Sequence, residues 1–310
     1  SEQDVAHVGF GQPPLQGEMT FEDENLVGET WQQKCQRLLN DGEAMFVPSL
    51  DSVAWLSNTR GYQLPFQATS RAQALATKNS IQLIVDEFSR VSDNVANVFN
   101  VYKSINDLKI EGIKKIIIFP SVTTVSDYLS LKKFGLEIEE RAGSLALEHA
   151  KKNPTEIKVM EDSFDRGDQA IFKTLSWLKQ EVAIRAVNER EWNDMTTKHY
   201  QEFGSKGQSF RTISGFGANS SIIHYGTPSS QKNWSEGELA LLDSGGFFAG
   251  GLATDTTRTI LPKGKASQEQ KKIYTLVLKG LLNAQNAIFP VGTRGVAVDA
   301  LARAQMRLHG

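Results

Sequence analysis

Apolar positions in the first half of the chain form short dense runs that alternate with helix-like patterns. These runs occupy residues 43–49, 79–86 and 113–120 and are predicted to be buried strands. The second and third are rich in β-branched residues and bounded by polar residues. Apolar residues spaced for one helix face occur in residues 29–42, 95–109 and 123–135, and residues 50–61 predict a helix or turn closed by Gly61. Strands that alternate with helices predict an α/β domain over residues 26–150. The polar, Gly- and Pro-containing residues 1–25 predict a tail or linker.

Longer amphipathic patterns begin near residue 150 and indicate a second domain over residues 151–310. Asn153 is a suitable cap before Pro154, and this pair predicts a helix start at that point. A second helix is predicted over residues 188–207, followed by a strand with a Gly- and Ser-rich loop over residues 209–226. Residues 239–246 and 254–262 are predicted as the two strands of a hairpin, and residues 267–290 and 294–310 as two helices.

Composition excludes several classes of partner. The 310 residues suffice for two domains, and 34 Lys and Arg against 36 Asp and Glu leave a net charge of −2, so neither nucleic acid nor an acidic membrane is an expected partner. Cys35 is the only cysteine, which excludes an internal disulfide and a thiolate zinc cluster and favours a reducing compartment, the cytoplasm by default. No secretory leader pattern and no apolar run of about 20 residues is present, which predicts a soluble protein.

Two aspartates carry the candidate chemistry. Asp243 and Asp255 lie near the adjacent ends of the two predicted hairpin strands, on either side of a glycine-rich link. Carboxylates this close repel each other unless a proton or a cation lies between them. Hard divalent metals suit such oxygen ligands, and two ions about 3.5–4 Å apart commonly share a bridging carboxylate. The alternative is an exposed hairpin with solvated aspartates and ordinary turn glycines, and the residues of the hairpin alone leave both interpretations open.

Six stretches of the sequence, taken in order, carry a further signal: LDSVAWLSNTRG (50–61), KNPTEI (152–157), NSSIIHYG (219–226), LLDSGG (241–246), TDTTRT (254–259) and residues 276–303. Together they resemble the aminopeptidase P family of pita-bread metallopeptidases, a group that also includes prolidase, methionine aminopeptidase and creatinase. NSSIIHYG resembles the strand with the active-site histidine, and LLDSGG and TDTTRT resemble the strands with the first two metal ligands. The resemblance is to the large, three-domain cytosolic branch and covers residues 26–310.

This resemblance implies a fold, a site and an activity. The fold would be a creatinase/prolidase N-terminal-like α/β domain followed by part of an α+β pita-bread catalytic domain. Asp243 would be a terminal ligand of one of two divalent ions, usually manganese, and Asp255 would bridge both. His224 would lie beside the metals and contact the scissile peptide or the tetrahedral intermediate. The implied activity is release of an N-terminal residue preceding proline by a metal-bridged hydroxide, on peptides with proline in the second position, by a complete protein that is a homodimer.

The chain departs from the family pattern in two ways. The link between the aspartates is one residue longer, which a bulge at its glycines could absorb. The family's three further ligands, a histidine and two glutamates, are expected beyond this point, and Glu269, Asp299 and His309 are not placed to replace them. The sequence therefore resembles the middle of a longer polypeptide, without the first domain and the second half of the catalytic domain, and we expect this chain alone to be catalytically incomplete.

Two other functions remain open. One is a non-catalytic pita-bread module that binds peptides or acts as a scaffold, and the other is a prolidase-type dipeptidase. Creatinase uses no metal, so the retained aspartate pair argues against it. His149 and His199 lie on helical patterns and are expected at the surface or at a boundary, not as ligands.

Overall fold

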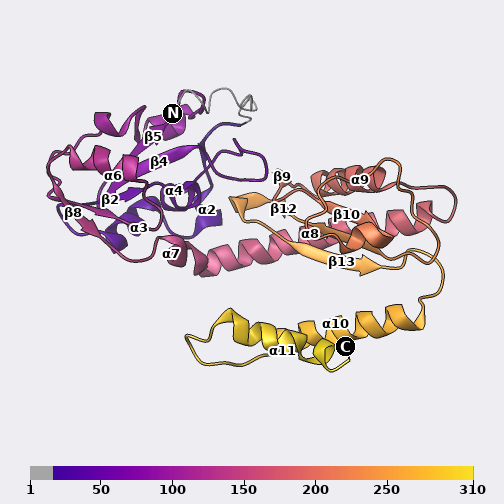
Figure 1. The fold of residues 1–310 in the computed structure, drawn as a ribbon. Coiled ribbons are helices and arrows are strands. Elements are labelled where there is room, and N and C mark those ends of the chain that lie inside the picture. The colour runs from indigo at the N-terminus through magenta and orange to yellow at the C-terminus, as the bar shows by residue number, and fades with distance from the viewer. Residues whose placement is uncertain (1–16, 310) are drawn as a thin grey trace, which may run out of the picture.

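The computed structural model describes residues 17–309, and the first part of the chain forms a six-stranded mixed sheet covered by helices (Figure 1). From edge to edge the strands are β6 (Asn100–Tyr102), β5 (Ile81–Val85), β4 (Ala72–Thr77), β2 (Glu43–Val47), β7 (Lys115–Ile118) and β8 (Glu137–Glu140). The helices of this part are α2 (Glu24–Val27), α3 (Trp31–Leu38), α4 (Leu50–Ser57), α5 (Asp93–Ala96), α6 (Val125–Lys132) and α7 (Ala146–Ala150). The α/β class expected for this part is confirmed.

Both faces of the six-stranded sheet are buried. Along β2, Met45 and Val47 belong to one apolar cluster and Ala44 and Phe46 to another, because successive side chains of a strand point to opposite faces. A strand covered on both faces has a nearly continuous run of apolar residues, which explains why the sequence predicted β2, β5 and β7.

Three expectations for the first part differ from the structure. The helix expected over residues 95–109 is wrong: the segment contains the end of α5, strand β6 and the turn η1 (Ile105–Asp107), because Val101 and Tyr102 pair with β5. Helix α4 ends at Asn58, whose φ is 56°, and not at Gly61. The expected tail lies partly outside the described residues, but Met19 within it is fully buried, and the short strands β1 (Thr20–Phe21) and β3 (Thr59–Arg60) pair.

The second part is built on a three-stranded antiparallel sheet with two helices on one face (Figure 1). Its strands run in the order β10 (Ile213–Phe216), β11 (Ala240–Ser244) and β13 (Thr256–Ile260), and its helices are α8 (Pro154–Glu181) and α9 (Glu189–Glu202). Helix α8 starts where the sequence predicts, since Asn153 and Glu156 form a reciprocal capping box and Pro154 opens the helix. Leu178, Trp192 and Leu242 belong to the core between helices and sheet.

Helices α10 (Gln268–Gln285) and α11 (Gly295–Arg307) pack mainly against each other, below the sheet in Figure 1. They cross closely, because a Cβ on Gly280 would lie 2.2 Å from the carbonyl oxygen of Ala302. None of the helices within residues 17–309 combines the length and the apolarity needed to cross a membrane.

Direct contacts join the two parts. The Glu22 carboxylate accepts a hydrogen bond from the Gly250 amide (3.2 Å) and lies 3.4 Å from the Lys206 ammonium. The Asn153 side-chain amide also donates to the Val27 carbonyl (2.8 Å). The segment that carries Gly250 links the two aspartate-bearing strands, so the first part of the chain supports it.

Candidate metal centre

Strand alternation places the two aspartates on the open face of the three-stranded sheet. In β11, Ala240, Leu242 and Ser244 are buried toward the helices, so Asp243 points to the other face. Asp243 pairs in register with Thr257, and Asp255 precedes Thr257 by two residues. Asp255 therefore lies on the same face as Asp243.

The two carboxyl groups interact directly. Burial raises the pKa of Asp255, and the charge of Asp243 and a hydrogen bond to it raise that pKa further. The Thr257 hydroxyl donates to Oδ1 of Asp243 (2.9 Å) and fixes its orientation. The pair thus holds negative charge that a proton or a cation would stabilise.

The link between the aspartates does not form the expected bulge. After β11 the chain leaves this sheet as β12 (Gly246–Phe247), pairs with β9 (Gly207–Gln208), and turns through η3 (Ala249–Gly251) before β13. Thr254 closes this excursion, because its amide donates to the Gly246 carbonyl (3.0 Å) and its hydroxyl accepts from the Gly246 amide (3.0 Å). Ser244 pairs with Thr256 and Phe247 bridges to Ala253, so one antiparallel register continues past Asp255 without a bulge.

His224 reaches the same cavity from a turn. The expectation of a strand at residues 219–226 is wrong: η2 (Gly217–Ser221) and a turn occupy the segment, and His224 has φ 58°. The hydroxyls of Ser220 and Ser221 donate to the carbonyls of Gly217 and Ala218 and so stabilise the turn over an extended strand.

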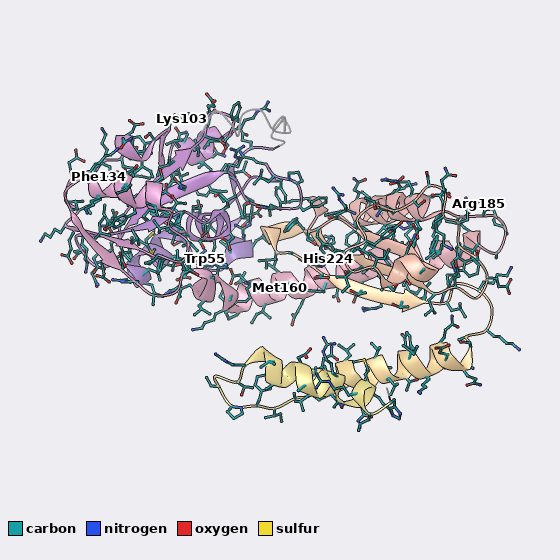
Figure 2. All side chains as sticks on the ribbon, viewed as in Figure 1. Trp55, Lys103, Phe134, Met160, Arg185 and His224 are labelled. Carbon is teal, nitrogen blue, oxygen red and sulfur yellow. The ribbon has the colours of Figure 1, made fainter. Side chains whose placement is uncertain are left out.

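One cavity of about 560 Å³ collects the predicted site residues. It is lined by Asp243, Asp255 and His224 together with Phe210, Arg211, Ile213 and Gly226. The exposed His224 is labelled at the centre of the molecule in Figure 2, beside the end of the sheet. The structure therefore brings together all three side chains that the sequence singles out.

A buried carboxylate holds the His224 turn in place. Glu189, the first residue of α9, is fully buried. Its Oε1 accepts from the Phe216 amide (2.9 Å) and the Asn219 side chain (3.0 Å), and its Oε2 accepts from the Tyr225 hydroxyl (2.8 Å) and the Ser229 amide (3.0 Å). The sequence analysis missed Glu189, because an acidic residue in the first turn of a helix is an ordinary pattern.

Thr257 was also missed, although a signal was present. Period-two alternation in TDTTRT places Thr257 on the same face as Asp255. A hydroxyl two residues from a candidate ligand, on the same face of a strand, is a suitable partner for a neighbouring carboxylate.

The other titratable residues considered lie elsewhere. Asp299 pairs with Arg303 (2.8 Å), Glu269 is exposed in the first turn of α10, and His309 does not line the cavity. His199, expected at a surface or boundary, is instead only 3% exposed, and its Nδ1 lies 2.9 Å from the Thr174 hydroxyl. His149 is partly buried beside Asp51. Among residues 17–309, no group of three or more His, Cys, Asp or Glu side chains is arranged to hold a metal ion.

Comparisons with known proteins agree with this architecture. Residues 12–156 match the creatinase/prolidase N-terminal domain, and residues 158–310 match metallopeptidase family M24. The chain is similar to a probable Xaa-Pro aminopeptidase P of Coccidioides posadasii (34% identical over 92% of this chain and 47% of that protein). It is also similar to Xaa-Pro aminopeptidase 2 of Mus musculus (30% identical over 95% of this chain and 47% of that protein). The chain thus spans about half the length of these curated relatives.

A solved structure shares the fold of almost the whole chain. It is the crystal structure of an X-prolyl aminopeptidase from Caenorhabditis elegans, described as a cytosolic enzyme with a di-nuclear active site. The TM-score is 0.81 at 22% identity, over 99% of this chain and 53% of that one. With both domain families matched in order and relatives of one kind, the chain belongs to the aminopeptidase P branch of metallopeptidase family M24.

Proposed function

We propose that this chain forms part of a metal-dependent aminopeptidase that releases an N-terminal residue preceding proline. The observation that carries the proposal is the Asp243–Asp255 pair, two interacting carboxyl groups in a cavity that His224 also lines. The two curated relatives described above are both named Xaa-Pro aminopeptidases, which supports the substrate class.

The residues present fit two divalent ions in part. Asp243 and Asp255 would hold them through carboxylate oxygens, which are the donors that hard cations such as manganese prefer. A bound cation would lower the raised pKa of Asp255 again, because it favours the ionised carboxylate. When bound, two such ions would polarise the scissile carbonyl and lower the pKa of a water molecule. We propose manganese as the metal on this donor chemistry.

The chain's own residues would orient the reaction. Thr257 orients the Asp243 carboxylate by donating to Oδ1, and both oxygens keep lone pairs that could face a cation. His224 is exposed at the cavity, where its imidazole can donate a hydrogen bond to the oxygen that gains charge when the peptide carbonyl is attacked. Glu189 positions His224 through the residues on either side of it.

Metal titration tests the role of the aspartates. We expect manganese to bind this chain measurably by isothermal titration calorimetry and Asp255→Asn to weaken that binding at least about tenfold, because a bridging ligand would be lost. Asp162→Asn is the matched control, since Asp162 is exposed on α8 and paired with Arg166. Equal manganese binding by the Asp255 variant and the unaltered chain would remove the metal role.

A substrate assay tests the reaction. In a polypeptide that contains this chain, we expect manganese-dependent release of the first residue from a tripeptide with proline in second position, and none when alanine replaces that proline. Binding of the proline peptide without release would instead favour a non-catalytic peptide-binding module, and cleavage of dipeptides alone would favour a prolidase.

Three further expectations also stay proposals. A cytoplasmic location is supported by the single, buried Cys35, which suits a reducing compartment. A homodimer can be tested by light scattering, and a domain division between residues 150 and 151 can be tested by limited proteolysis.

A further inference from the structure

A second cavity, of about 390 Å³, lies between the two parts of the chain and shares no lining residue with the aspartate cavity. One wall comes from α4 and residues 66–69, a second from the end of α7 and the start of α8, and a third from residues 247–253. Cavities of this size at domain interfaces are common ligand sites.

Arg60 supplies a preorganised anion-binding group to this cavity. Its side chain is only 9% exposed, and its Nη1 donates to the carbonyls of Ala54 (2.9 Å) and Thr59 (2.8 Å). Within residues 17–309, neither Nε nor Nη2 of Arg60 has a hydrogen-bond partner. These two N–H groups lie on the same edge of the guanidinium plane, and their spacing matches the two oxygens of a carboxylate.

The nearby carboxylates do not fill this role. Glu22 and Glu156 are the acidic neighbours that act on Arg60, yet neither forms an ion pair with it. Glu22 accepts from Gly250 and Lys206, and Glu156 accepts from the Asn153 amide (2.9 Å). In the described part of the chain, Nε and Nη2 of Arg60 have no protein partner and keep some contact with solvent, so a carboxylate that enters the cavity could accept hydrogen bonds from both.

The remaining lining favours a ligand with an apolar body. Trp55, Phe66 and Phe247 are aromatic, and Phe66 is 38% exposed with φ 61°, a conformation that bulky residues rarely adopt. Lys152 adds a second cation, whose ammonium donates to the His149 carbonyl, and Asp51 and Glu156 add two carboxylates. Burial lowers the pKa of His149 and so favours its neutral form. This chemistry suits a carboxylate attached to an aromatic or aliphatic group.

The third wall connects this cavity to the aspartate pair. Residues 247–253 are the link between β11 and β13, and Gly251 packs so closely on Arg60 that a Cβ there would lie 2.5 Å from Nε. A molecule bound to Arg60 would therefore rest against the segment that ends two residues before Asp255.

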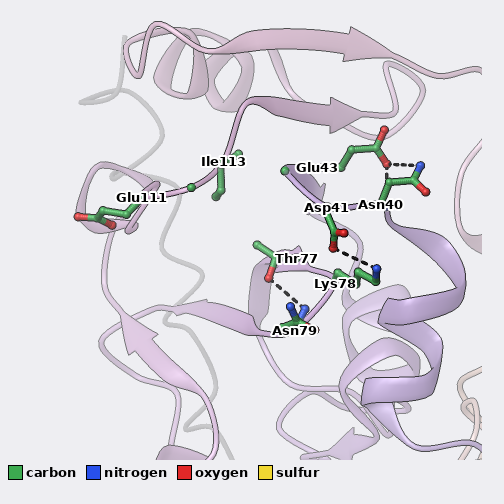
Figure 3. Close-up of a pocket in the computed structure, with 10 residues that line it drawn as sticks. Asn40, Asp41, Glu43, Thr77, Lys78, Asn79, Glu111 and Ile113 are labelled. Atoms are coloured by element: carbon green, nitrogen blue, oxygen red, sulfur yellow. Dashed lines mark hydrogen bonds and ion pairs between the residues drawn. The ribbon is translucent and has the colours of Figure 1, made fainter.

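By contrast, a smaller cavity of about 170 Å³ at one end of the six-stranded sheet has polar groups that satisfy one another (Figure 3). There Lys78 pairs with Asp41 (3.0 Å), and the Asn40 side chain donates to Glu43 (3.1 Å). Among the described residues, no unpaired buried cation lines this smaller cavity, so nothing there indicates a bound anion.

We infer that the cavity between the two parts of the chain binds a small molecule with a carboxylate on an apolar body, held by Arg60, and that the bound molecule restrains residues 247–253. This site is separate from the proposed metal centre and does not depend on the proposed peptidase activity.

Calorimetry with matched probes tests the binding. N-acetyl-L-phenylalanine carries the carboxylate and an aromatic body, N-acetyl-L-phenylalaninamide lacks the carboxylate, and acetate lacks the body. We expect the acid to bind at least about tenfold more tightly than either of the others, because each lacks one of the two recognised features. A tripeptide ending in phenylalanine, compared with the single acetylated residue, shows whether peptide C-termini or small free acids fit better. Equal binding of acid and amide, or no binding of the acid, would overturn the inference.

Variants locate the site. Arg60→Gln should weaken binding of the acid at least about tenfold, whereas Arg185→Gln, at an exposed arginine paired with Glu181 and Glu191, should not. Because Arg60 also holds two backbone carbonyls, circular dichroism checks its fold, and Phe66→Ala tests the same site through the apolar wall if the Arg60 variant is unfolded. Unchanged binding of the acid by a folded Arg60→Gln variant refutes the site. If Arg60→Gln is unfolded, unchanged binding by Phe66→Ala refutes it instead.

Hydrogen exchange tests the contact with the link. We expect the acid to slow amide exchange in residues 247–254 of the unaltered chain and of Asp255→Asn alike, since the carboxylate binds Arg60 and not the aspartate cavity. Unchanged exchange of this segment with the probe bound would contradict the restraint.

Discussion

The carboxylate of Glu189 offers a sharp test of how the candidate site is held together. It is fully buried and accepts four hydrogen bonds, from Phe216, Asn219, Tyr225 and Ser229. Glu189→Gln preserves the shape but replaces one oxygen with an amide that can only donate. One backbone N–H, of Phe216 or of Ser229, would then face another donor, because the Tyr225 hydroxyl and the Asn219 side chain can turn to accept.

The magnitude follows from these contacts. A hydrogen bond to a charged group contributes about 1.5–3 kcal/mol, and neighbouring losses add less than their sum. We therefore expect Glu189→Gln to lower the free energy of unfolding of the second part of the chain by about 3 kcal/mol. Because Asn219, Tyr225 and Ser229 flank His224, amide exchange should also become faster in residues 219–229.

Urea unfolding followed by tryptophan fluorescence measures the stability, since Trp192 belongs to the core of this part. Glu191→Gln is the matched control two residues along the same helix, where the carboxylate is partly exposed and paired with Arg185. We expect no measurable change for that variant. If Glu189→Gln unfolds at the same urea concentration as the unaltered chain, or leaves exchange in residues 219–229 unchanged, Glu189 does not hold the His224 turn.

Three further predictions concern charge and close packing. Asp243→Asn should lower the pKa of Asp255 in metal-free protein, because it removes the neighbouring charge, and a carboxyl NMR titration that shows no decrease would contradict the interaction. Burial lowers the pKa of Lys34 to about 8, so between about pH 8 and 10.5 the Lys34 side chain is protonated in the unfolded chain and largely neutral in the folded one. The free energy of unfolding should therefore rise with pH in that window by about 1.4 kcal/mol per pH unit relative to Lys34→Met. A constant difference between the urea unfolding curves of the two proteins would argue against the shift. Gly245→Ala should destabilise the chain by at least about 2 kcal/mol in urea unfolding, since its Cβ would lie 1.8 Å from the Thr254 carbonyl oxygen, and a near-neutral result would show that the aspartate link relaxes freely.

Periodic local signals predicted much of the fold. The capping box at Asn153 and the apolar runs of β2, β5 and β7 depend on neighbours close in sequence, and the structure confirms them. Strand β8 was not predicted, because it is a short polar edge strand of sequence EIEE whose extended form depends on pairing with β7. The same dependence on a distant partner explains the missed strand β6, which pairs with β5.

Patterns local in sequence predicted part of the candidate site, whereas contacts between distant segments could not be predicted. The predicted hairpin placed the two aspartates near each other, the family resemblance singled them out as ligands, and the structure places both on one face. The burial of Glu189 and of His199 follows from packing between elements far apart in sequence, which leaves no local pattern. The route of the aspartate link was missed for the same reason, since β12 leaves the sheet to pair with β9.

The left-handed backbone of His224 has a practical consequence for mutagenesis. Its φ of 58° lies in a region where Asn, Asp and His are several-fold enriched and where other side chains cost about 1–2 kcal/mol. Replacement by alanine would therefore remove the imidazole and strain the turn at once. Replacement by asparagine removes the imidazole while the backbone keeps a residue that tolerates this conformation. Only the asparagine variant separates the chemistry of the ring from the shape of the loop that presents it.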